Sequence, residues 1–146
     1  MAGGKGATFE SNLLALIFNA TAMSSPSLAQ NESSSPLTNL YVALHTANPG
    51  ASGSQTTNEA AYTSYARVAV ARTSSGWTIT ANSVSPNAAI TFPTATGGSE
   101  TETYFSVGSA SSGSGQIFWF GPLSSNIVVS NGVTPQLTTA TAVTES

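Results

Sequence analysis

Cysteine and aspartate are absent from the sequence, and charge of either sign is scarce. Without cysteine the chain has neither disulfides nor a thiol nucleophile, and without aspartate it has neither a Ser-His-Asp triad nor an aspartic dyad. Charged residues make up 6% of the 146 residues, whereas an average soluble domain has about 25%. These absences exclude several classes of hydrolase before any motif is considered.

Positive charge is the scarcest property of all. Lys5, Arg67 and Arg72 are the only basic residues, and the net charge is −3. Because phosphate binding needs clustered lysine and arginine, we expect no nucleic-acid partner. The longest apolar run, Leu13–Phe18, is far shorter than the roughly 20 residues that a membrane-spanning helix needs, so we expect no membrane partner either.

Few residues remain as candidates for catalysis or metal binding. His45 is the one histidine and no G-x-S-x-G motif is present, so we expect a structural, hydrogen-bonded imidazole. Glu100 and Glu102 are of the residue type used in glycosidase pairs, but they follow a Gly/Ser/Thr loop and open a strand, which predicts a solvated strand edge. The spacing fits no zinc or calcium site. The sequence predicts a protein that is not an enzyme and that has no cofactor or metal.

Serine, threonine, glycine, alanine and asparagine take the place of charge. A surface with so few charges gains little solubility from repulsion between like charges. We therefore expect other proteins to cover it, in an assembly that includes further copies of the same chain. The length predicts a single domain with its own hydrophobic core.

The amino-terminal segment predicts an amphipathic helix, with Thr8 as its N-cap and Glu10 in its first turn. Apolar residues recur there at helical spacing, namely Phe9, Leu13, Leu16, Ile17 and Ala20. We expect this face to pack on the rest of the domain or on a neighbouring subunit. Residues 1–8 contain three glycines and are predicted to form a flexible arm, and residues 9–146 are predicted to form one domain.

After a predicted loop over Ser24–Thr38, short segments rich in β-branched and aromatic residues alternate with turn residues. The predicted strands are Leu40–Thr46, Tyr65–Thr73, Trp77–Ala81, Ala88–Phe92, Thr103–Ser109, Gln116–Gly121, Asn126–Ser130 and Thr138–Thr144. About eight strands at this spacing predict an all-β fold, an antiparallel β-sandwich of jelly-roll-like form with one amino-terminal helix.

Turn residues divide these strands. Hairpins are expected at Ser74–Gly76 and at Ser111–Gly115. The prolines should fall at strand ends, because proline donates no ladder hydrogen bond; they are Pro86, Pro93, Pro122 and Pro135.

Alternation along Tyr65–Thr73 places Ala66, Val68 and Val70 toward the core, with Arg67 on a solvent-facing or partner-facing side. We expect Arg67 to pair with Glu59 in the preceding loop. The segment Gln116–Phe120 is apolar on both sides, so something must cover its second side. The candidate interface residues are Phe9, Leu13, Ile17, Arg67, Phe118, Trp119 and Phe120.

Five segments share a pattern with a known family. They are LYVALHT at Leu40–Thr46, the turn Asn48-Pro49-Gly50, the pair Asn58-Glu59, the strand Tyr62–Val70, and ITFPTATGG at Ile90–Gly98. In this pattern the chain resembles short virion proteins of tailed phages that are commonly labelled tail fibre or minor tail fibre proteins. The resemblance implies a structural protein located in the virion.

Three functions follow from the sequence and the resemblance together. We first expect a capsid decoration or cement protein that binds the assembled shell, because the chain is compact and has no fibrous repeat or coiled coil. The alternative is a small tail-fibre or tail-tip component. In both cases the partners are other virion proteins, either the major capsid protein or tail proteins. A further alternative is a surface glycan-binding module with Tyr62, Tyr65 and Trp77 as stacking faces.

Overall fold

The computed structural model describes residues 5–22 and 36–145. Residues 1–4 of the predicted arm and most of the predicted Ser24–Thr38 loop lie outside the described residues. Within them the chain forms one helix and nine strands: α1 (Ala7–Asn19), β1 (Asn39–His45), β2 (Val68–Ala71), β3 (Trp77–Thr80), β4 (Ser83–Pro86), β5 (Ile90–Thr91), β6 (Glu100–Gly108), β7 (Ile117–Val129), β8 (Gln136–Leu137) and β9 (Val143–Thr144).

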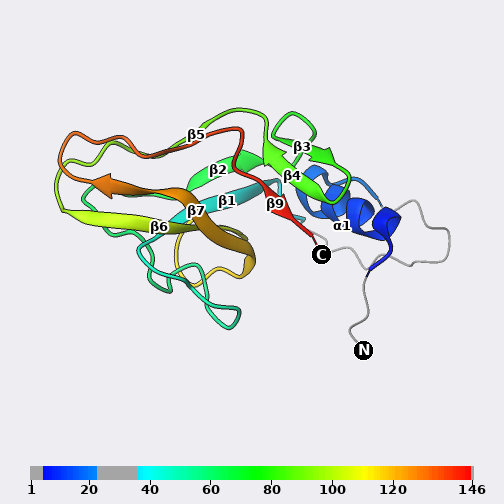
Figure 1. The fold of residues 1–146 in the computed structure, drawn as a ribbon, viewed down its shortest axis with the longest axis horizontal. Helices are drawn as coiled ribbons and strands as arrows, with labels where there is room; N and C mark the ends of the chain where they lie inside the picture. The colour runs from blue at the N-terminus through cyan, green and yellow to red at the C-terminus, as the bar shows by residue number, and fades with distance from the viewer. Residues whose placement is uncertain (1–4, 23–35, 146) are drawn as a thin grey trace.

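The strands form three antiparallel sheets. The largest has the order β2-β1-β6-β7, and smaller sheets have the orders β3-β4-β9 and β5-β8. In Figure 1 the helix lies at one end of the domain, beside β3 and β4. The predicted all-β, sandwich-like fold with one amino-terminal helix is confirmed.

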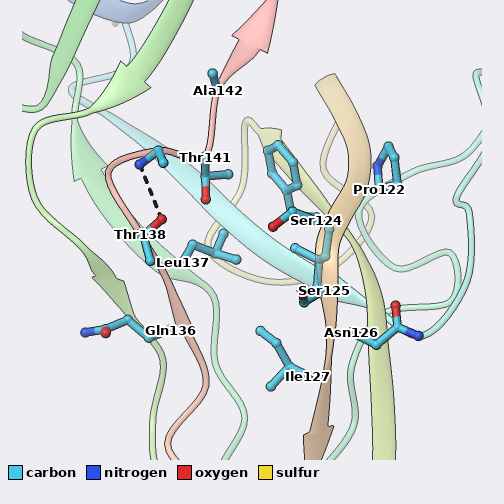
Figure 2. A pocket seen from close by; sticks show the side chains of 13 residues that line it. Pro122, Ser124, Ser125, Asn126, Ile127, Gln136, Leu137, Thr138, Thr141 and Ala142 are labelled. Carbon is cyan, nitrogen blue, oxygen red and sulfur yellow. Dashed lines mark hydrogen bonds between the residues drawn. The ribbon is translucent and has the colours of Figure 1, made fainter.

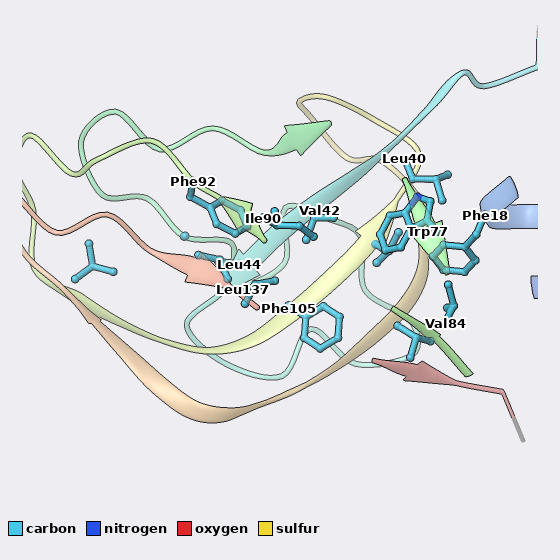
Figure 3. Close-up of a cluster of buried hydrophobic side chains, with 14 of the residues drawn as sticks. Phe18, Leu40, Val42, Leu44, Trp77, Val84, Ile90, Phe92, Phe105 and Leu137 are labelled. Carbon is cyan, nitrogen blue, oxygen red and sulfur yellow. The ribbon is translucent and has the colours of Figure 1, made fainter. Parts of the chain in front are cut away.

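The hydrophobic core forms on one face of the large sheet. Leu40, Val42 and Leu44 alternate along β1, and all three are buried. Their register partners on the two flanking strands are also apolar, so one continuous face results: Val68 and Val70 of β2, and Phe105 and Val107 of β6. Figure 3 shows how the smaller sheets close this face, with Ile90, Phe92 and Leu137 over its middle and Trp77 and Val84 toward the helix.

The helix packs on the domain through a different side from the one predicted. Leu14 and Phe18, four residues apart, are fully buried, whereas Phe9 is 41% exposed and Ala20 is exposed. The run Leu13–Phe18 is apolar all around, so the sequence does not distinguish one side from another. The phenyl ring of Phe18 meets the indole of Trp77 edge to face at 4.8 Å, and this contact fixes the helix.

The start of the helix also differs from the prediction. Thr8 is not the N-cap, because the helix begins at Ala7 with Gly6 in the capping position and no side-chain cap. Part of the predicted arm is therefore helical. At the other end, Ala20 takes a left-handed conformation with φ 52° and the Thr21 N–H donates to the Ala15 carbonyl at 3.0 Å, which ends the helix.

The carboxy-terminal half contains the largest error in the predicted strands. The segments Gln116–Gly121 and Asn126–Ser130 belong to one 13-residue strand, β7. Pro122 lies inside it and not at a strand end, which the fold tolerates because β7 is an edge strand. The register between β6 and β7 slips between Glu102 and Tyr104, so the intervening residues of β7 form a bulge instead of a turn.

Other strand bounds also differ from the predictions. β2 is shorter than predicted, and it lies in a different sheet from β3, so Ser74–Gly76 is not a hairpin. The hairpin that does form joins β3 to β4 through Ala81 and Asn82, with Ala81 at φ 55°. Asn82 is a usual turn residue but Ala81 is not, and this hairpin was not predicted. The predicted strand Thr138–Thr144 is reduced to β9, and β8 was not predicted. The Ser111–Gly115 hairpin between β6 and β7 is confirmed.

Candidate interaction surfaces

Arg67 lies inside the domain, so the prediction that it faces solvent or a partner is wrong. Its side chain is 2% exposed, and the predicted pair with Glu59 is confirmed as a bidentate contact. Nε lies 2.6 Å from Oε1 of Glu59, and Nη2 lies 2.8 Å from Oε2. Arg67 also donates to the carbonyls of Ala110 and Gly113, at 2.9 and 2.7 Å. The guanidinium therefore joins the long β1–β2 loop to the β6–β7 loop.

Gln55 strengthens the same junction, although nothing in its sequence context marked it. It is fully buried, its amide nitrogen donates to the Tyr41 carbonyl at 3.1 Å, and its oxygen accepts the Ala110 N–H at 3.0 Å. The space for it depends on two glycines, since a Cβ at Gly108 or Gly115 would lie within 2.6 Å of the Gln55 amide. A side chain at either glycine would displace the amide.

His45 is structural, as predicted. It is fully buried, with Nδ1 2.9 Å from the Thr57 carbonyl and Nε2 2.8 Å from the Ser106 hydroxyl. Burial lowers the pKa of the imidazole below its ordinary value of 6.5. Because a carbonyl can only accept, the neutral ring carries its proton on Nδ1 and donates to Thr57, and Nε2 accepts from the Ser106 hydroxyl.

The three aromatic residues expected to stack on a glycan are not available for stacking. Tyr62 and Trp77 are each 3% exposed, and the ring of Trp77 packs against Phe18. The Tyr62 hydroxyl donates to the Pro93 carbonyl at 2.9 Å. The Tyr65 hydroxyl donates to Glu59 and accepts the Leu44 N–H. This group of residues belongs to the core.

The structure distributes the candidate interface residues over separate places. Leu13 and Ile17 are half-buried on α1, and Ile17 packs against the core, whereas Phe9 is largely exposed. Phe118 and Trp119 of β7 pack against the core. The Trp119 ring lies 5.2 Å from that of Phe18, and its N–H donates to Glu145 at 3.2 Å. The helix and the carboxy-terminal segment thus cover Trp119, and Phe120 remains exposed.

β7 carries two of the four large apolar side chains that are exposed in the described residues. Val128 is 68% exposed and Phe120 is 36% exposed. The strand forms one edge of the large sheet, and no strand pairs with its outer side in the described part of the chain. It has no charged residue, although most natural edge strands are protected by charge, proline or bulges. Pro122 and the bulge protect only its middle.

A groove of about 550 Å³ runs along the bulged part of β7. Figure 2 shows it between the segment Pro122–Ile127 and the segment Gln136–Ala142. Its lining has no charged group and combines apolar side chains of different sizes with hydroxyl and amide groups, which belong to Ser124, Ser125, Asn126, Gln136, Thr138 and Thr141. Such a lining offers neither a metal ligand set nor a catalytic base.

Glu102 does not lie on a solvated edge, contrary to the prediction. It is fully buried, and burial together with the neighbouring Glu100 raises its pKa to about 8. Glu100 is half-buried, and its Oε1 accepts the N–H groups of Ala61 and Tyr62 at 2.8 and 2.7 Å. The sequence places these glutamates in a polar loop, and only the tertiary packing reveals their burial.

The few charges of the chain serve internal contacts. Besides Arg67, Arg72 donates to the carbonyls of Leu16 and Ile17 in the last turn of α1, at 2.6 and 2.7 Å, and to that of Leu37 ahead of β1, at 3.2 Å. Lys5 pairs with Glu145. Among the described glutamates, Glu10 and Glu102 have a carboxyl group with no ion pair or hydrogen bond in this part of the chain, and Glu102 is fully buried. The outer surface of the described residues is therefore close to neutral.

The described residues contain no group of three or more histidine or acidic side chains arranged to hold a metal ion. Within the same residues, no helix has both the length and the apolar character needed to cross a membrane.

The chain matches one known protein family over most of its length. The family described as "Podophage GP4 fiber I protein gp80" matches residues 4–144, which is nearly the whole chain. No curated protein matches it.

Proposed function

Because the chain belongs to the podophage GP4 fiber I protein gp80 family, we propose that it serves as a small fibre component of a phage virion. Membership of this family supports a structural protein of the virion. The finer assignment to a fibre follows the family description and ranks above the capsid decoration that we first expected from compactness alone. The observation that carries the proposal is a neutral surface on which β7 leaves large apolar side chains exposed.

Such a surface suits repeated contacts with other subunits. Val128 and Phe120 lie on an uncharged edge strand, and a neutral edge can approach an identical edge without repulsion between like charges. Stable protein contacts bury roughly 1,600 Å² in total, so β7 would supply the centre of an interface and not the whole of it. The partners on this proposal are further copies of the chain and other virion proteins.

A charge placed on β7 tests the location of the contact. Val128→Lys and Phe120→Lys each add one positive charge to the strand, and Ser112→Lys adds the same charge to an exposed loop as a control. If β7 is the interface, the two β7 variants fail to assemble with virion proteins while remaining folded, and Ser112→Lys assembles normally. Equal assembly of all three variants would contradict this location.

Capsid decoration remains the second candidate, because the fold is a compact domain whose first and last described segments meet at one end. Particles made without the protein separate the two functions. A fibre component gives heads that retain DNA normally but adsorb poorly to cells. A decoration protein gives particles that lose DNA on heating and recover when purified protein is added back. Quantitative counting of copies per virion provides an independent check, since decoration requires hundreds.

A further inference from the structure

Glu102 is a carboxyl group without a hydrogen-bond donor. It is fully buried, and neither of its oxygens has a partner among the described residues. Its register partner on β7, Ile127, packs against the hydrophobic core. An ionised carboxylate in such surroundings is strongly disfavoured, because nothing replaces the water that it has lost.

Glu100 lies two residues earlier on the same strand and shares this environment. Its register partner is Val129, which is fully buried. Because register partners lie on the same side of a sheet, both glutamates are on the core-facing side at this end of β6. The N–H groups of Ala61 and Tyr62 both bind Oε1 of Glu100, and two such donors favour the ionised form of that carboxylate.

We propose that Glu100 and Glu102 share one proton, with Glu102 as a carboxylic acid that donates to the carboxylate of Glu100. This arrangement gives the buried carboxyl group its missing partner and keeps one negative charge on the pair. It also connects β6 to the long loop at Ala61 and Tyr62, since Glu100 binds both. The proposal rests on the fold and is independent of the fibre assignment.

The pKa values of Glu102 and of its neighbour Tyr62 agree with a proton shared between the two glutamates. Burial, and then the adjacent Glu100, raises the pKa of Glu102 to about 8, so this carboxyl group is protonated at neutral pH. Tyr62 is the other titratable group beside the pair. Burial and the two glutamates raise its pKa to about 12, so its phenol stays neutral throughout the range in which Glu102 titrates.

A shared proton makes this contact sensitive to pH. The native state holds a proton that the unfolded chain releases near pH 4.5, so the stability that Glu102 contributes is complete below that pH and is lost as the pH rises toward about 8. His45 acts in the opposite direction, because its lowered pKa reduces stability as the pH falls below 6.5. The range above pH 6.5 therefore isolates the effect of Glu102.

Thermal melting of the full chain between about pH 6.5 and 9.5 tests the proposal. We expect the wild-type melting temperature to fall on the order of 5 °C across this range. The melting temperature of Glu102→Gln should stay constant over this range, because the glutamine amide donates to Glu100 without titrating. The melting temperature of Glu10→Gln, which removes an acid outside the pair, should fall as that of the wild type does.

A direct readout covers the case in which a variant fails to fold. In wild-type protein labelled with carbon-13 at the glutamate carboxyl groups, we expect the Glu102 resonance to titrate with a midpoint near 8. Removing the neighbouring charge with Glu100→Gln should lower that midpoint.

Three outcomes would overturn the proposal. One is a Glu102 midpoint near 4.5, and another is a fall in the melting temperature of Glu102→Gln that equals the wild-type fall. The third is a rise in the wild-type melting temperature on adding calcium at pH 8.5 that is absent in Glu102→Gln, since this result would assign the pair to a cation and not to a proton.

Discussion

Arg67 and Glu59 form a bidentate ion pair, in which both carboxylate oxygens accept hydrogen bonds from the guanidinium, Oε1 from Nε at 2.6 Å and Oε2 from Nη2 at 2.8 Å. The two residues are eight positions apart in the sequence. Arg67 also donates to two carbonyls of the β6–β7 loop, more than forty positions farther along the chain. Two loops that have no regular structure of their own are thereby fixed to each other.

Breaking this pair should destabilise the domain strongly. A buried pair that loses one partner leaves an uncompensated charge, so Arg67→Ala should lower the free energy of unfolding by about 3 kcal/mol. Arg67→Lys should recover little of it, because an ammonium group cannot reproduce the two-pronged contact. Urea denaturation of Arg67→Ala, Glu59→Ala and the double variant gives the coupling energy, and a coupling of zero would refute the role of the pair.

The packing of α1 should depend on its buried side and not on the side that the sequence favoured. Phe18→Ala removes a ring that contacts both Trp77 and Trp119 and should cost about 3 to 5 kcal/mol of unfolding free energy. Phe9→Ala is the matched control on the same helix, and its exposed ring should contribute less than about 0.5 kcal/mol. Equal losses for the two variants in calorimetry would contradict the observed helix orientation.

Arg72 should stabilise the end of α1. Its guanidinium satisfies carbonyls that the last helical turn leaves without partners, and its positive charge suits that end of the helix dipole. Arg72→Ala should cost about 1 to 3 kcal/mol and should raise amide hydrogen exchange in α1 more than in β1. Exchange that increases equally in both elements would indicate global destabilisation instead.

Association with virion partners should depend little on salt. The basic side chains of Lys5, Arg67 and Arg72 are all held in internal contacts. Few charged groups therefore remain to contribute to an interface, and dissolved salt has little attraction to screen. Binding of purified protein to particles that lack it should change less than about twofold between 0.05 and 0.5 M sodium chloride. A tenfold loss of binding at high salt would show that charged groups carry the contact.

The sequence predicted those features that depend on local pattern. The alternation of Leu40, Val42 and Leu44 marked β1, and the proximity of two opposite charges in a chain with few of them predicted the Arg67–Glu59 pair. Both patterns involve residues that are close together in the sequence, so they can be recognised without knowledge of the tertiary fold.

Other features depend on contacts that are distant in sequence. Five of the six residues in Leu13–Phe18 are large and apolar, so only the position of Trp77 decides that Phe18 turns inward. The continuity of β7 through Pro122 depends on its edge position, and the burial of Glu102 depends on the core beneath that end of β6. A polar loop sequence gives no indication of either.

The ion pair between Lys5 and Glu145 brings the two ends of the described chain together at the helix end of the domain. A short linker could therefore close residue 145 onto residue 5 without changing the shape of the domain. Because the two ends are close together, peptides attached to either of them would extend from the helix end of the domain. The ends of β6 and β7 that lie away from the helix would carry no added chain.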